Sequence, residues 1–437
     1  MEILLTSIYL TLILLLIKKW KFFKSKQLSI KLLTGLFIVK FAMGLFVFWI
    51  YSGYYSNNKY NRHDADIFKY YDDSEVIYNS LKSKPLDFTQ IILGLDFNKD
   101  YFSDEYYINM NNWDTHYKSH IFNDARVIIR INAFFRIFSF GFYSIHILFF
   151  CFISFLGLFA LFKATSSYIA SKEKLFFICL SLTPSILFWS SAVLKEPLMI
   201  YAVGFILLYF KNIKNDRLKI VPTIHLLICL LILFFLKFYV FCILIVLLIP
   251  FSINSLKDFR FKVVPYFLCF LFFTSLTLLL KKVDSKFDIA QLIEQKQASF
   301  ISESKYKNAG SYFEITDLNP DYQSIVKAIP IGIINSLSRP LIWKVKKLIQ
   351  VPSAIENIFF ISFILMSIIN ILKNKSILAK HTNLLLFCLF FVLINYALIG
   401  IITPISGALV RYKIIALPFL IILLLKTTHY NPLKSFK

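Results

Sequence analysis

The sequence predicts an all-α, polytopic integral membrane protein. Of its 437 residues, 58% are hydrophobic and 18% are aromatic, and the mean hydropathy is +0.67, far above that of an ordinary soluble domain. Apolar runs long enough to form membrane-crossing helices recur along nearly the whole chain. We therefore expect a single integral membrane domain over residues 1–437, without an appended soluble catalytic domain.

The apolar runs predict about eleven membrane-crossing helices. They fall at 3–17, 28–50, 141–162, 175–192, 196–210, 220–236, 238–254, 263–280, 354–372, 383–402 and 412–425. In the first run the charges follow the apolar stretch, and no small-residue cleavage site is present. We therefore expect a retained helix and not a cleaved signal peptide. Charges at Lys195, Glu196 and Lys237 separate two crowded pairs of runs, and each pair could instead be a broken or re-entrant element.

The charge of the connections alternates along the chain and predicts the orientation. The basic connections hold 21 lysines and arginines against 3 acids, and all lie on one side of an eleven-helix arrangement. These connections are 18–26, 163–174, 211–219, 256–262, 373–381 and the tail 426–437. Because cytoplasmic loops carry an excess of Lys and Arg, we expect the C-terminus inside and the N-terminus outside. The net charge of +23 is thus a topology signal and not a nucleic-acid-binding face.

Two long polar segments, 51–128 and 281–352, consequently fall on the external side. The first holds 12 acids against 8 bases. The second is predicted to form amphipathic helices along the membrane interface, such as "FDIAQLIEQKQASFISES". Nucleotide-binding loops, HExxH and GxSxG are absent from the sequence. The six cysteines lie inside apolar runs without CxxC spacing and are expected to be small core residues.

The first candidate site is the stretch "NRHDADIFKYYDDSEVIY" at 61–78. On a helix, Asp66, Tyr70 and Asp73 share one face, with Asp64 just before it. A neighbouring face suited to rest on the bilayer surface holds Ile67, Tyr71, Ser74 and Tyr78. A solvated acidic helix explains the stretch without any activity. The functional alternative is a carboxylate that acts as general base or metal ligand at the outer membrane face.

The second candidate is "PSILFWSSAVLKEPLMIY", in which Lys195 and Glu196 interrupt an apolar span. A charge at membrane depth costs roughly 2.5–3.5 kcal/mol on insertion, so we expect these side chains to face a polar cavity or each other. Neighbouring residues on a helix do not face each other, so an ion pair between these two is not expected. A lysine that snorkels from a short external turn is the alternative.

The third candidate is a pair of external arginines, Arg339 in "NSLSRPLIW" and Arg411 in "GALVRYK". The guanidinium fork matches the geometry of a phosphate, whereas interfacial anchoring is the alternative for each arginine alone. Lys237, between two apolar runs, belongs to the same set with a weaker claim. Three further arginines with weaker claims lead into the run at 141–162, namely Arg126, Arg130 and Arg136.

The acid-then-tyrosine run "DADIFKYY" resembles the first-loop acidic motif of GT-C-type glycosyltransferases. The stretches "FRIFSFGFYSIHILFFCFISFLGLFALF", "PSILFWSSAVLKEP", "LSRPLIW" and "GALVRYKIIALPFL" are similar to those of bacterial envelope-polysaccharide membrane proteins. The resemblance implies that Asp66, with Asp64 beside it, activates the acceptor or binds a divalent cation. By analogy of chemistry Arg411 holds the donor phosphate. One departure is that the acidic loop follows the second predicted helix here, and the first in that family.

The resemblance, together with these features, implies a bacterial inner-membrane glycosyltransferase in envelope polysaccharide or glycolipid assembly. Its donor is a polyprenyl-phosphate-linked sugar and its acceptor a glycan or lipid, with no nucleic acid involved. The expected ligands of the donor phosphate are Arg411, Arg339 and Lys195. Glu196, Tyr70 and Lys237 are expected to support these ligands. Whether the enzyme uses a divalent cation is left open by the sequence. The alternatives are a repeat-unit polymerase, a transporter or flippase that uses the charges at 195–196 and 237, and a non-catalytic scaffold.

Overall fold

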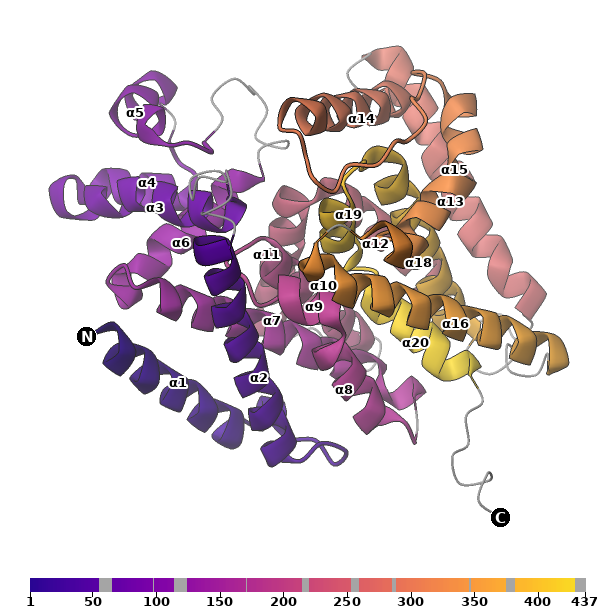
Figure 1. Cartoon of the computed structure of the whole chain (residues 1–437), viewed down its shortest axis with the longest axis horizontal. Helices are drawn as coiled ribbons and strands as arrows, with labels where there is room; N and C mark the ends of the chain where they lie inside the picture. The colour runs from indigo at the N-terminus through magenta and orange to yellow at the C-terminus, as the bar shows by residue number, and fades with distance from the viewer. Residues whose placement is uncertain are drawn as a thin grey trace. The chain divides into compact units, whose positions relative to one another are not determined.

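The computed structural model describes residues 1–54, 65–96, 98–113, 124–169, 171–213, 220–252, 259–284, 288–345, 347–374 and 382–428. Within these ranges the protein is all-α, with 19 α-helices (Figure 1). The chain forms two compact units. Unit 1 consists of Met1–Ser167, Glu173–Leu182 and Ile186–Phe241, and unit 2 of Tyr168–Lys172, Thr183–Ser185 and Cys242–Lys437.

Unit 1 begins with a helical hairpin of α1 and α2 (Figure 1). The hydroxyl of Ser29 accepts a hydrogen bond from the amide of Leu32 at 3.2 Å and so caps the start of α2. The helices of unit 1 are α1 (Glu2–Lys19), α2 (Ile30–Trp49), α3 (Asp66–Ser83), α4 (Pro85–Leu93), α5 (Lys99–Glu105), α6 (Ala125–Ser139), α7 (Tyr143–Thr165), α8 (Glu173–Leu182), α10 (Glu196–Ile213) and α11 (Ile220–Leu236). Two helices, α9 (Pro184–Trp189) and α12 (Phe238–Ser252), have residues in both units.

Helix α7 is the centre of unit 1 and packs most extensively against α10. The two helices cross where Gly157 of α7 faces Gly204 of α10. A methyl group on Gly204 would overlap the backbone carbonyl of Gly157, and one on Gly157 would overlap the backbone of Tyr201. Small residues are common at such crossings in membrane proteins because they let two helix backbones approach closely.

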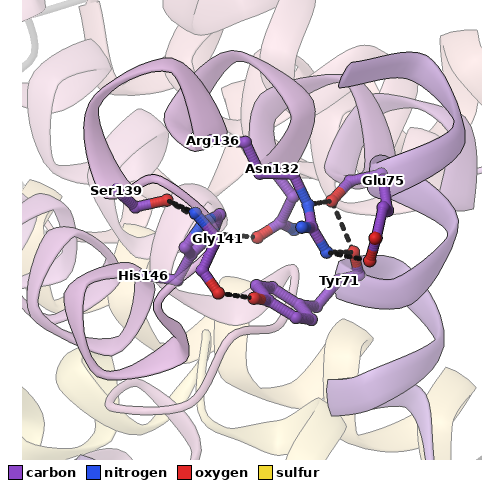
Figure 2. Close-up of polar contacts among 8 residues, drawn as sticks. Tyr71, Glu75, Asn132, Arg136, Ser139, Gly141 and His146 are labelled. Carbon is purple, nitrogen blue, oxygen red and sulfur yellow. Dashed lines mark hydrogen bonds and ion pairs between the residues drawn. The ribbon is translucent and has the colours of Figure 1, made fainter. Parts of the chain in front are cut away.

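A polar network around the buried Arg136 joins α3, α6 and α7 in unit 1 (Figure 2). Arg136 donates from Nη2 to the carbonyl of Tyr71 and from Nε to the hydroxyl of Ser74, both at 2.8 Å. Its guanidinium also lies 4.1 Å from the ring centroid of Tyr71, and Nη2 lies 3.4 Å from a carboxylate oxygen of Glu75. His146 bridges Ser139 and Asn132 with ring-nitrogen distances of 2.8 Å. This network fixes α3 on the rest of unit 1.

Unit 2 has its own close helix crossing, between α15 and α18. A methyl group on Gly332 of α15 would lie 2.7 Å from the carbonyl oxygen of Ala397, and one on Gly400 of α18 would overlap the backbone of Gly332. The helices of unit 2 are α13 (Phe259–Val283), α14 (Ile289–Tyr306), α15 (Tyr322–Ser338), α16 (Val351–Lys373), α18 (Thr382–Ile402), α19 (Ser406–Lys413) and α20 (Leu417–Thr427). Gln297 of α14 ties this helix to the end of α18, because its Nε2 donates to the carbonyl of Ile401 at 2.8 Å.

The expected all-α fold is confirmed, whereas the expected membrane crossings are supported only in part. Among the described residues, five helices are long and apolar enough to span a membrane, or up to six if one bent pair is a single span. The five are Ile30–Gly53, Tyr143–Tyr168, Lys262–Val283, Leu348–Lys373 and Thr382–Ile402, and the bent pair is Ser406–Lys413 with Leu417–Thr427, at 67°. The protein is therefore a helical protein with several candidate spans.

The remaining apolar runs also form helices, and several of these are short or interrupted. The run at 175–192 is divided into α8 and α9, of 10 and 6 residues, at Pro184, which cannot continue the helix before it. Helices α11 and α12 have 17 and 15 residues and meet at Lys237, the suspected break. The second polar segment contains helices, as predicted: the quoted stretch forms α14, and α15 is another helix of the same segment.

The expected helix in the acidic stretch is confirmed as α3, but its expected bilayer-facing surface is largely buried. Ile67, Tyr71 and Ser74 are all less than a tenth exposed, and Tyr71 and Ser74 belong to the Arg136 network. The hydroxyl of Tyr143 on α7 donates to the carbonyl of Ile67 at 3.0 Å. This face therefore packs inside unit 1, because α6 and α7 supply polar partners that the sequence pattern of α3 does not reveal.

Candidate functional site

Two lysines of unit 1 converge on one carboxylate, that of Asp124. Lys195 Nζ lies 2.6 Å from Oδ1 of Asp124, and Lys237 Nζ lies 3.0 Å from Oδ2. Asp124 directly precedes α6, Lys195 directly precedes α10, and Lys237 stands between α11 and α12. All three charged groups thus lie where helices begin or break, and we call them the Asp124 cluster.

Burial increases across the Asp124 cluster from the carboxylate to Lys195. The side chain of Asp124 is 26% exposed, that of Lys237 is 20% exposed and that of Lys195 is 8% exposed. Solvent therefore reaches the side chains of Asp124 and Lys237, whereas that of Lys195 is almost fully buried. Burial alone would raise the pKa of Asp124, but the ammonium groups of Lys237 and Lys195 outweigh burial and hold that pKa well below its usual range.

Tyr70 of α3 borders the Asp124 cluster. The ammonium of Lys195 lies 4.9 Å from the centroid of the Tyr70 ring, a cation–π distance. Asp66 precedes Tyr70 by one helical turn and lies on the same side of α3. Glu196 occupies the first turn of α10 and is buried. Lys195 was not expected to pair with Glu196, and its observed ion-pair partner is Asp124.

Asp73, the third acid on this face of α3, has a structural role. Its two carboxylate oxygens accept hydrogen bonds from the backbone amides of Asn111 at 2.9 Å and Asn112 at 2.8 Å. Burial raises the pKa of Asp73, and the two amide bonds oppose that rise. Asp73 therefore fastens the end of the described 98–113 segment to α3.

Replacing this carboxylate should loosen the segment without unfolding α3. We expect Asp73→Ala to accelerate hydrogen–deuterium exchange at the amides of Asn111 and Asn112, because both lose their acceptor. The exposed Asn79→Ala on the same helix is the control. Unchanged exchange at both amides in Asp73→Ala would show that other contacts hold the segment.

Two arginines of α6, which follow Asp124 closely in the sequence, lie against a tryptophan. The guanidinium carbons of Arg126 and Arg130 lie 5.2 and 5.1 Å from the centroid of the Trp113 ring, and Tyr107 stacks on Trp113 at 4.3 Å. Arg130 also pairs with Asp96 at 3.2 Å. These contacts give both arginines a structural role, in agreement with their weaker claim as phosphate ligands.

The two arginines predicted to bind phosphate, Arg339 and Arg411, lie in unit 2. The guanidinium of Arg339 stacks 4.1 Å from the ring centroid of Phe313, and its Nε donates to the side-chain oxygen of Asn335 at 3.2 Å. Within the described part of the chain Arg339 makes no ion pair. Its guanidinium is thus oriented by protein contacts, and no carboxylate of the described ranges neutralises its charge. Arg411 belongs to α19.

Three charged residues, Asp124, Lys40 and Glu356, were not selected from the sequence, and only the last two carried a signal there. Asp124 was one of many acids in a net acidic segment, and nothing in its neighbourhood indicated two lysine partners. Lys40 is 2% exposed within the candidate span that contains α2, and its Nζ donates to the hydroxyl of Ser190 at 2.5 Å. A single charge inside an apolar run is the signal that could have found Lys40. Glu356, alone in the run at 354–372, carried the same signal.

Asp64 lies outside the described residues. Among the residues that are described, no group of three or more His, Cys, Asp or Glu side chains is arranged to hold a metal ion. No protein-family model matches this chain, and no similar curated protein or solved structure is found. A functional assignment therefore depends on the chemistry of the side chains themselves.

Proposed function

We propose that the protein is a multi-pass membrane glycosyltransferase of GT-C type that uses a polyprenyl-phosphate-linked sugar at the external face of the bacterial inner membrane. The observation that carries this proposal is the Asp124 cluster, with Tyr70 beside it and Asp66 one turn away on α3. Cations held together by a fixed carboxylate are suited to bind the phosphate of such a donor. The product enters envelope polysaccharide or glycolipid assembly.

In the proposed reaction, Asp66 is the general base and the cluster lysines hold the donor phosphate. Asp66 removes the proton from the acceptor hydroxyl, and that oxygen forms a bond to the anomeric carbon of the sugar. The bond between the anomeric carbon and the phosphate oxygen breaks, and Lys195 and Lys237 stabilise the charge of the departing polyprenyl phosphate. Arg339 and Arg411 in unit 2 stay predicted ligands of a lipid phosphate. We also propose that the N-terminus lies on the external side of the membrane.

The test of this role is Asp66→Asn in a strain that lacks the gene, at matched protein levels in the membrane. Because a positioned general base contributes about 10²–10⁴-fold to a rate, we expect surface glycan to fall to nearly the level of the empty vector. Asp72→Asn, on the same helix, is the matched control. Full restoration of surface glycan by Asp66→Asn would remove the acid–base role.

A transporter or flippase of a lipid-linked sugar is the second candidate, favoured by one observation. Both lysines of the Asp124 cluster stand at helix interruptions, Lys195 between α9 and α10 and Lys237 between α11 and α12. Interrupted helices often form the substrate sites of transporters. In vesicles that contain the purified protein, a transporter moves a lipid-linked sugar between leaflets without an acceptor. A transferase forms a glycosidic product only when an acceptor is added.

A further inference from the structure

The connection between α9 and α10, residues 190–195, is an irregular segment in the core of unit 1. We call it the buried turn, because each of its residues is less than a tenth exposed. Irregular segments usually run over a protein surface, since backbone amides and carbonyls lose their water partners when they are buried. The buried turn therefore needs polar partners from the helices around it.

Helices α7 and α2 enclose the first two residues of the buried turn. The hydroxyl of Ser154 on α7 donates to the carbonyl of Ser190 at 2.7 Å. The thiol of Cys151, also on α7, donates to the carbonyl of Ser191 at 3.4 Å. The backbone of α2 approaches from another side, because a methyl group on Gly44 would lie 2.7 Å from the carbonyl oxygen of Ser191. The two serines are thus held closely by the surrounding helices.

Lys40 of α2 is a further partner of the buried turn. Its ammonium donates to the hydroxyl of Ser190 at 2.5 Å, and Lys40 is 2% exposed within the candidate span Ile30–Gly53. Among the described residues Lys40 makes no ion pair. A charged side chain at such a depth is costly and marks a functional site by default. Because no described carboxylate offsets this cost, stability alone does not explain a lysine at this position.

The buried turn ends at Lys195, whose ammonium lies 2.6 Å from Oδ1 of Asp124. A shift of the turn would therefore move Lys195 within the Asp124 cluster, and a misplacement of about 1 Å can cost an active site about 10²-fold in rate. We propose that Lys40 is a positioning residue, which fixes the buried turn through Ser190 and thereby holds Lys195 against Asp124. This inference rests on the proposed function of the Asp124 cluster as the donor phosphate site.

The variant Lys40→Met tests this role in the full-length protein in nanodiscs, because it keeps an apolar stem and removes the donor to Ser190. We expect hydrogen exchange at the amides of Ser191 and Leu194 to accelerate, and the affinity for a polyprenyl monophosphate to fall about tenfold. The unfolding temperature should stay the same or rise, because an apolar group replaces a buried charge. Lys31→Met, at an exposed position of α2, is the control.

The variant Ser190→Ala separates positioning from a direct effect of the lysine charge. It removes the same hydrogen bond but keeps the ammonium, so we expect a similar loss of affinity. The double variant Lys40→Met/Ser190→Ala should bind no more weakly than either single variant, because both remove one shared contact. Wild-type affinity in folded Ser190→Ala, beside weakened binding in Lys40→Met, would overturn the proposal. A lowered unfolding temperature of Lys40→Met would overturn it as well, since that result indicates a purely structural role.

Lys237→Met, measured in the same series, separates this inference from the proposed function. If Lys237→Met binds the polyprenyl monophosphate weakly and Lys40→Met binds it as the wild-type protein does, the positioning role is overturned and the proposed function stands. If both variants bind as the wild-type protein does, the proposed function itself is contradicted. Unchanged hydrogen exchange in the buried turn of Lys40→Met would overturn the role of Lys40 in either case.

Discussion

Gly204→Ala is expected to destabilise unit 1 strongly. The added methyl group would overlap the carbonyl oxygen of Gly157, and a backbone atom inside a helix cannot move aside as a flexible side chain can. α7 and α10 would have to separate, which would weaken the most extensive helix contact of the unit. Overpacking of this kind costs about 1–3 kcal/mol. Thermal unfolding of the purified protein in nanodiscs measures the effect.

Gly35→Ala is the matched control for this substitution. Gly35 also lies within an apolar helix, α2, but a methyl group there would meet no atom within 4 Å. Because alanine favours the helix over glycine by about 1 kcal/mol, Gly35→Ala should leave the unfolding temperature unchanged or raise it. If the two variants unfolded at the same temperature, α7 and α10 would not cross as closely as described.

Asp124→Asn is expected to destabilise unit 1 at neutral pH and to reduce surface glycan. The amide removes the negative charge that Lys195 and Lys237 share, and the two partly buried ammonium groups then repel each other. Loss of one member of a buried ion pair costs about 3 kcal/mol. The exposed Asp104→Asn on α5 is the control, and Asp124→Asn/Lys237→Met should recover part of the lost stability because it removes one of the two repelling charges.

The same carboxylate predicts how stability depends on pH. The pKa of Asp124 in the folded protein lies below its ordinary value of 3.8. Its contribution is therefore complete above that value and is lost as the pH falls toward the lower, folded value. Denaturant unfolding of Asp124→Asn should show a smaller loss of stability between about pH 5 and pH 3 than the wild-type protein shows. An identical acid dependence would mean that Asp124 is not held by the lysines.

The sequence predicted the helices well because their cause is local. Apolar runs, together with the i, i+4, i+7 spacing of Asp66, Tyr70 and Asp73, define helix positions and faces without knowledge of partners. The break at Lys237 was predicted for the same reason, since isolated charges interrupt apolar helices, whereas the division of the run 175–192 at Pro184 was not predicted. Helix length and hydropathy alone do not determine which of these helices cross the membrane, and in the described part of the chain five or six candidates meet both requirements.

The partners of the polar groups could not be predicted because they depend on tertiary contacts. Lys195 and Lys237 were selected from sequence as charges at interruptions, but Asp124, which joins them, precedes Lys195 by 71 residues. The burial of Tyr71 and Ser74 likewise follows from Arg136, more than 60 residues away. Sequence patterns identify groups that need a partner, and only the fold supplies its identity.

The affinity of the purified protein for a polyprenyl monophosphate, measured in nanodiscs by native mass spectrometry, tests the central claim most directly. Lys237→Met leaves Lys195 and Asp124 as a neutral pair and should weaken binding about tenfold, since a charge-assisted hydrogen bond contributes about 1.5–3 kcal/mol. Asp66→Asn should bind as the wild-type protein does, because the base contacts the acceptor and not the donor phosphate. Lys282→Met, at an exposed position of α13, is the control. Equal affinity of Lys237→Met and the wild-type protein would contradict the assignment of the Asp124 cluster as the donor phosphate site.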